Sequence, residues 1–163
     1  MKKILFSATS LLLTIGTVFA ADPPPMKEGY WSIHTVTIDQ PGDKKQETNR
    51  SICRNHAYDQ YVQELAKKQS AACKVTESSS GGTRTTESEC TVAGTVVRSK
   101  GTVTGAGENA AHSETTATYT PPMGGMSGMT MIMDQKFMGA CPAGVVPGDM
   151  ITADGRKTNN WKH

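Results

Sequence analysis

The amino-acid sequence predicts a small α+β domain that is mainly β, with a strongly curved antiparallel meander sheet of about seven strands and one helix. Two observations predict this class. Most of the 163-residue chain consists of threonine-rich extended runs separated by glycine-containing turns, and only one segment has helical periodicity. The runs have one lightly apolar face, which is typical of an antiparallel sheet with one wet face. We expect the sheet to curl toward a partly closed barrel.

The first strand is predicted at residues 30–38, where Trp31 and Ile33 alternate with Tyr30 and other residues of the opposite face. The sequence Gln-Pro-Gly-Asp at 40–43 is a strong turn signal. A second strand at 45–53 would then return antiparallel to the first.

The single helix is predicted at about residues 55–69. Asn55 is a suitable N-cap, because its side chain can accept a hydrogen bond from a free backbone N–H of the first turn. Four apolar or aromatic residues recur at the spacing i, i+3, i+4, i+7 and would form one face of an amphipathic helix: Tyr58, Tyr61, Val62 and Leu65.

The chain after the helix is again extended. Candidate strands follow at residues 73–78, 83–92, 95–104, 113–119 and 130–137. The globular domain is therefore placed at residues 29–141. The remaining segment, 142–163, is rich in Pro, Gly, Asp and Asn, and we expect it to be an irregular C-terminal extension.

The N-terminus has the pattern of a secretory signal peptide at residues 1–20. Lys2 and Lys3 precede an apolar stretch that is too short for a membrane span, and small residues place cleavage between Ala20 and Ala21. Residues 21–28, with their three consecutive prolines, would be a linker. We expect a periplasmic protein without a stable membrane anchor after cleavage.

The charge of the mature chain argues against nucleic acid as a partner. Removal of the leader takes away Lys2 and Lys3 and leaves fifteen basic and fifteen acidic residues. No basic cluster longer than a dipeptide remains, and nucleic-acid binding normally needs one.

Four cysteines in an exported chain predict two disulfides, which would stabilise a domain with few large apolar residues. Four cysteines allow three pairings. We favour Cys53–Cys73, across the ends of the helix, with Cys90–Cys141. A zinc site is less well supported, since no two of the cysteines have C-x2-C spacing.

A methionine-rich segment at residues 123–133 is the most biased local feature. Thioethers are soft ligands that suit Cu(I), so Met123, Met126 and Met129 form a candidate Cu(I) or Ag(I) site. The alternative is packing, because Met129, Met131 and Met133 alternate and would share one face of a strand. Apart from this metal, no cofactor is expected.

No catalytic constellation is recognisable, and we expect a protein that is not an enzyme. Cys53 and His56 could resemble a nucleophile and base, but Cys53 would be oxidised in an exported protein. The serine hydrolase motif G-x-S-x-G is absent from the sequence. Glu87 and Glu89 would share one face of a strand, where solvent-exposed carboxylates are ordinary.

Several of these features together resemble a known family. In chain order, these features are the run MKEGYWSI at 26–33, Cys53 at the end of the second strand, Cys73 before the third, Cys90 in the fourth, and the Met-rich strand before Gly139-Ala140-Cys141. Together they resemble the bacterial exported family called domain of unknown function 3617. The resemblance covers residues 26–141 and implies a periplasmic, disulfide-bearing, β-rich domain. The family carries no assigned activity, so no catalytic residue can be transferred.

These observations favour a non-enzymatic periplasmic domain that binds an unknown ligand or envelope protein through its curved sheet. A Cu(I)- or Ag(I)-binding protein is the second hypothesis. An enzyme of unrecognised type is the third.

Overall fold

The structure, a computed structural model, describes residues 26–105 and 107–161. The predicted leader at 1–20, its cleavage site at Ala20–Ala21 and most of the predicted linker lie outside the described residues. Elements follow in the order β1 (Gly29–Gln40), β2 (Lys44–Arg54), α1 (His56–Gln69), β3 (Lys74–Ser80), β4 (Thr83–Val92), β5 (Thr95–Thr104), β6 (Ala110–Met123), β7 (Met126–Gly139), β8 (Asp149–Thr152) and β9 (Lys157–Asn159).

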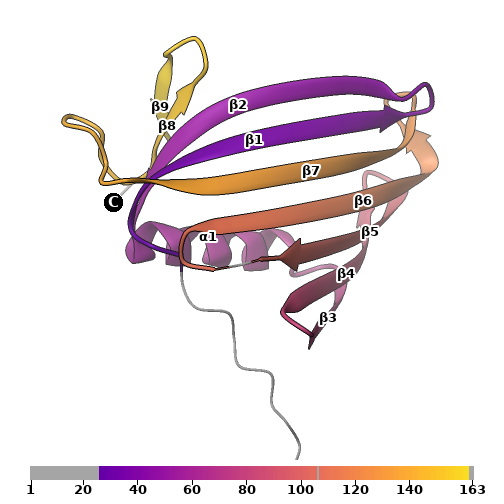
Figure 1. Ribbon diagram of the computed structural model, residues 1–163. Coiled ribbons are helices and arrows are strands. Elements are labelled where there is room, and N and C mark those ends of the chain that lie inside the picture. Colours follow the sequence, from indigo (N-terminus) through magenta and orange to yellow (C-terminus); the bar gives the residue numbers. More distant parts are fainter. Residues whose placement is uncertain (1–25, 106, 162–163) are drawn as a thin grey trace, which may run out of the picture.

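All strands form one antiparallel sheet, as predicted, in the order β3-β4-β5-β6-β7-β1-β2-β8-β9. The sheet is strongly curved, and α1 lies on its concave side (Figure 1). The predicted mainly β class with one helix is confirmed. The sheet does not close into a barrel, because β3 and β9 are its two free edges and no pairing joins them in the described part of the chain.

The helix begins and ends where the sequence predicts. The side chain of Asn55 accepts a hydrogen bond from the backbone N–H of Tyr58 at 2.8 Å, which satisfies one of the free donors of the first turn. At the other end, Lys67 and Lys68 occupy the last turn, where positive charge suits the helix dipole.

The main core lies at one end of the concave face. Trp31 is fully buried and packs with Ile33 and Ile52. The ring of Phe137 meets the indole edge to face, with centroids 5.6 Å apart, and the indole N–H donates to the carbonyl of Lys27 at 2.9 Å. This small core fits a domain in which only 6% of residues are aromatic.

The cysteines form two disulfides, but the predicted pairing is wrong. Cys53 is bonded to Cys141 and Cys73 to Cys90. The order of the strands explains the difference. Cys73 directly precedes β3, which pairs with β4 and so lies beside Cys90, and the chain after β7 passes the start of β1 to reach Cys53.

The sequence predicted an irregular extension at 142–163, but its described part, residues 142–161, is not irregular throughout. It forms the β8–β9 hairpin, which extends the sheet beyond β2. Asp149 holds this hairpin: its buried carboxylate accepts hydrogen bonds from the backbone N–H of Val146 and from Asn159, both at 2.9 Å. Lys157 adds an ion pair at 3.2 Å.

The glycines of the Met-rich segment form a tight turn between β6 and β7. Gly124 and Gly125 both have positive φ, at 58° and 83°, which is the requirement of a two-residue hairpin turn of the I′ type. The turn places Met123 opposite Met126.

Candidate functional site

Helix α1 crosses the concave side of the sheet as a strap. It connects β2, near one edge, with β3, the opposite edge strand, so the chain must pass over the strands between them (Figure 1). A helix of 14 residues spans about 21 Å. Although it lies over a sheet face, none of its residues is buried. Burial of its own side chains therefore contributes little to holding it in place.

The N-terminal end of the strap is fixed to the main core. Arg54 forms an ion pair with Asp59 at 2.8 Å, and the two side chains are only 17% and 14% exposed. The guanidinium also lies 5.7 Å from the centre of the Trp31 ring. Tyr58 packs against the core cluster, and its partial burial raises the pKa of its phenol. The Cys53–Cys141 disulfide lies just before this end.

The C-terminal end of the strap is fixed by the second disulfide. Cys73 follows the helix closely and is bonded to Cys90 of β4. Cys90 lies opposite Val97, which lies opposite Tyr119, so these three side chains form one row across β4, β5 and β6. Tyr119 is 9% exposed. Each end of α1 therefore has its own covalent and packed anchor.

The middle of the strap carries apolar side chains that remain open to solvent. Tyr61, Val62 and Leu65 are 37%, 42% and 41% exposed. By helical periodicity they continue the stripe that begins at Tyr58, the residue that contacts the core. We call these four residues the apolar stripe. The sequence predicted the stripe correctly, but the stripe is not buried as the apolar face of an amphipathic helix normally is.

The sheet presents methionines on the same concave face. Met133 packs against the core cluster with Trp31, and Met131 and Met129 follow on the same face of β7 at the spacing of alternate residues. All three are partly buried. They lie opposite Thr35, Thr37 and Asp39 of β1, so the neighbours of the three thioethers on this strand are two hydroxyl groups and one carboxylate.

The proposed metal ligands divide between different places. Met123 and Met126 lie opposite each other at the β6–β7 turn. Met126 and Met129 are three residues apart on one strand, so alternation directs their side chains to opposite faces of the sheet. The trio Met123, Met126 and Met129 is thus not brought together on one face. Among the residues that the structure describes, no three His, Cys, Asp or Glu side chains could hold a metal ion.

The Cys53 and His56 pair is not a thiol and base. Cys53 is oxidised in its bond to Cys141, as expected, and His56 lies 3.5 Å from the carboxylate of Glu28. The other described histidines also face carboxylates. His34 lies 3.7 Å from Glu47, and His112 lies 2.7 Å from Asp134.

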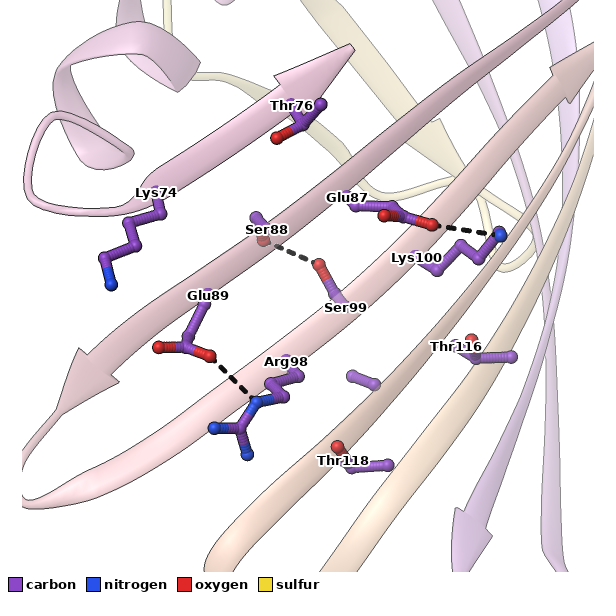
Figure 2. A pocket seen from close by; sticks show the side chains of 11 residues that line it. Lys74, Thr76, Glu87, Ser88, Glu89, Arg98, Ser99, Lys100, Thr116 and Thr118 are labelled. Carbon is purple, nitrogen blue, oxygen red and sulfur yellow. Dashed lines mark hydrogen bonds and ion pairs between the residues drawn. The ribbon is translucent and has the colours of Figure 1, made fainter. Parts of the chain in front are cut away.

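Glu87 and Glu89 lie on the opposite, convex face, in a shallow hollow of about 380 Å³ over β3 to β6. Each is paired across the strands, Glu87 with Lys100 at 3.0 Å and Glu89 with Arg98 at 2.8 Å (Figure 2). These carboxylates are solvent-exposed, and their charges are already balanced. Exposed pairs of this kind contribute at most about 1 kcal/mol each, and they indicate an ordinary sheet surface.

A second hollow, of about 510 Å³, lies over β1, β2, β7 and β8. The sequence offered no signal for it, because its residues come from the three strands β1, β2 and β7 and from the β8–β9 hairpin, which was not predicted.

No helix within the described ranges 26–105 and 107–161 is long and apolar enough to cross a membrane.

Within residues 26–105 and 107–161, the fold and the strap define a class: an open antiparallel sheet with one helix and two disulfides. A family model for a protein of unknown function, DUF3617, matches residues 26–141. The chain belongs to this family. None of the curated proteins matches it. The match ends at Cys141, so the β8–β9 hairpin lies beyond the region that the family model describes.

Proposed function

We propose that this chain is a non-enzymatic binding domain of the bacterial periplasm, and that it takes an apolar, elongated ligand between the strap helix and the concave face of the sheet. One observation carries the proposal. The apolar stripe lies on the side of α1 that meets the core, yet Tyr61, Val62 and Leu65 stay roughly two-fifths exposed.

The energetics of the strap support a binding role. Each Å² of apolar surface removed from water stabilises a structure by about 25 cal/mol, so an amphipathic helix normally buries its apolar face. Here two disulfides hold the helix in place without that burial. A ligand that covers the stripe would gain the stabilisation that the protein itself does not use.

The side chains that such a ligand would meet indicate its shape and chemistry. The stripe runs along the helix from Tyr58 to Leu65, which favours an elongated molecule such as an acyl chain. On the sheet, Met129 and Met131 offer flexible thioethers, which adapt to apolar partners of varied shape.

The periplasmic location rests on two supports. The first twenty residues have the order of a secretory leader, and both disulfides are of the kind that persists in oxidising compartments.

Palmitate binding tests the proposal. The oxidised mature protein, residues 21–163, is titrated with palmitate by calorimetry beside the variants Val62→Glu and Leu65→Glu. The expected result is saturable binding by the wild type and at least a tenfold higher Kd in both variants. Val146→Glu is the matched control, because Val146 is 53% exposed and lies outside the strap. Absence of saturable binding, or equal Kd values in all four proteins with intact circular dichroism spectra, would overturn the proposal.

Cu(I) or Ag(I) binding is the second candidate function. The observation that favours it is that Met129, Met131 and Met133 share one face of β7. Three thioethers on one strand face are the soft donor set that Cu(I) prefers.

A further inference from the structure

The second hollow lies on the face of the sheet opposite the strap. Its side chains stand in three neighbouring rows across the strands. The middle row consists of Ile151, Ser51, Ser32 and Lys136, which lie opposite one another on β8, β2, β1 and β7. Tyr30 stands on one side of this row, and Asn49, His34 and Asp134 stand on the other.

The differing sizes of these side chains explain the hollow. Ser32 and Ser51 are small and adjacent, and the longer side chains of Tyr30, Lys136 and Ile151 stand beside them. Gly139, which lies opposite Tyr30 on β7, has no side chain to cover the tyrosine ring. A volume of about 510 Å³ is within the range of about 300–1,000 Å³ that is usual for small-molecule sites.

Several polar groups of the hollow have no partner in the protein. Within the described part of the chain, the side chains of Tyr30, Asn49, Ser51 and Lys136 take part in no hydrogen bond or ion pair. The charged groups Asp134 and His34 of this hollow are paired with His112 and Glu47. In the hollow of Figure 2, Glu87 and Glu89 are likewise paired with basic side chains.

The chemistry of these groups selects a class of ligand. Ser51 and Asn49 can both donate and accept, Lys136 only donates, and Asp134 accepts. Arg50 also lines the hollow, but it lies opposite Ile33, and its guanidinium donates to the sulfur of Met150 on the other face of the sheet. The ammonium of Lys136 and the carboxylate of Asp134 then leave no excess of either charge, which argues against a purely anionic ligand. The ring of Tyr30 and the side chain of Ile151 add apolar surface beside these polar groups.

We infer that this hollow binds a neutral saccharide. Sugar hydroxyls donate and accept hydrogen bonds, as Ser51, Asn49 and Lys136 require, and the C–H face of a sugar ring can lie against Tyr30. The inference also gives the C-terminal hairpin a role, because Ile151 and Thr152 of β8 form one wall. The site does not depend on ligand binding under the strap.

Free sugar and polymer-bound sugar have the same chemistry, so the test has two arms. The ¹⁵N-labelled mature protein is titrated by NMR with N,N′-diacetylchitobiose, and separately with glycol chitin, a soluble neutral polymer of the same sugar. Amide shifts at residues 30–34, 49–51, 134–136 and 151–153 with either probe support the site. The probe that binds more tightly identifies the source.

Variants of the lining residues show whether the saccharide binds in the hollow itself. Asn49→Ala and Lys136→Ala should each raise the Kd at least fivefold, since both side chains are exposed and make no bond that the fold needs. Lys100→Ala, in the other hollow, is the matched control and should leave the Kd unchanged. Absence of shifts at these residues with both probes at 20 mM would overturn the inference, as would shifts produced by inorganic phosphate in their place.

Discussion

Cys73 and Cys90 are joined across the edge of the sheet, with their Cα atoms 4.4 Å apart, so that the end of α1 is fixed to β4. Cys53, at the other end of the helix, is fixed separately to Cys141. The two bonds do not tie the ends of the helix to each other. They tie each end to the sheet, and the strap between them keeps its apolar stripe half-exposed.

The two disulfides should differ in their contribution to stability. They join cysteines that are 88 and 17 residues apart in the sequence. The chain-entropy model gives about 4.6 kcal/mol for the longer loop and about 3.1 kcal/mol for the shorter one. Urea unfolding of the double variants Cys53→Ala/Cys141→Ala and Cys73→Ala/Cys90→Ala should show the larger loss of unfolding free energy in the first. Equal losses would contradict this, and peptide mass spectrometry without reduction checks the pairing itself.

The ion pair of Arg54 and Asp59 should matter more than the surface pairs do. Asp59→Ala leaves the guanidinium of Arg54 mostly buried beside Trp31 without its carboxylate, which should lower the free energy of unfolding by about 2 kcal/mol. Glu87→Ala removes an exposed pair with Lys100 and should cost less than about 1 kcal/mol. Urea unfolding of the two variants measures both losses of unfolding free energy. Similar losses would show that the pair of Arg54 and Asp59 does not anchor the helix.

The β8–β9 hairpin should loosen in acid because of Asp149. Hydrogen bonds, first from the backbone N–H of Val146 and then from Asn159, hold the pKa of this carboxyl below its ordinary value of 3.8. A lowered native pKa means that the carboxylate stabilises the fold above about pH 4, and that this stability is lost as the pH falls through the native pKa.

Hydrogen exchange or proteolysis of residues 142–161 between pH 5 and pH 2 measures this loosening. The variant Asp149→Asn should be loosened already at pH 5, with a loss of about 2 kcal/mol, and should show little further pH dependence in this segment. A wild-type hairpin equally protected at pH 5 and pH 2 would be inconsistent with this role.

Cu(I) binding, if it occurs, should depend on the concave methionines and not on those at the turn. Titration of the oxidised protein with Cu(I) against a competing chelator should show at least a tenfold loss of affinity in Met131→Leu. Met123→Leu should have no effect, because Met123 lies at the β6–β7 turn. A loss confined to Met123→Leu would favour the original trio of ligands, and no uptake by the wild type would exclude the metal function.

Local patterns in the sequence predicted the elements well. The N-cap at Asn55 and the spacing of Tyr58, Tyr61, Val62 and Leu65 are local signals, and they located α1 to within one residue. The strands from β1 to β7 were found for the same reason, although β6 and β7 extend further toward their turn than alternation alone indicated.

Features that depend on the order of the strands could not be predicted in this way. Four cysteines predicted two disulfides, but their pairing follows from the positions of β3 beside β4 and of β1 between β2 and β7. The β8–β9 hairpin was missed because its strands have only four and three residues, and a buried Asp149 stabilises it where an apolar pattern would be expected. The polar hollow could not be predicted either, because it depends on both the order of the strands and the presence of the hairpin.

The most direct test of the account is to locate a bound apolar chain by NMR. Mature protein with labelled methyl groups is saturated with palmitate, and nuclear Overhauser effects from the ligand are assigned. Contacts to the methyl groups of Val62 and Leu65 on the strap and of Met131 on the sheet are expected, all in one complex. Contacts confined to apolar side chains outside the strap, such as Val146 or Met138, would contradict it.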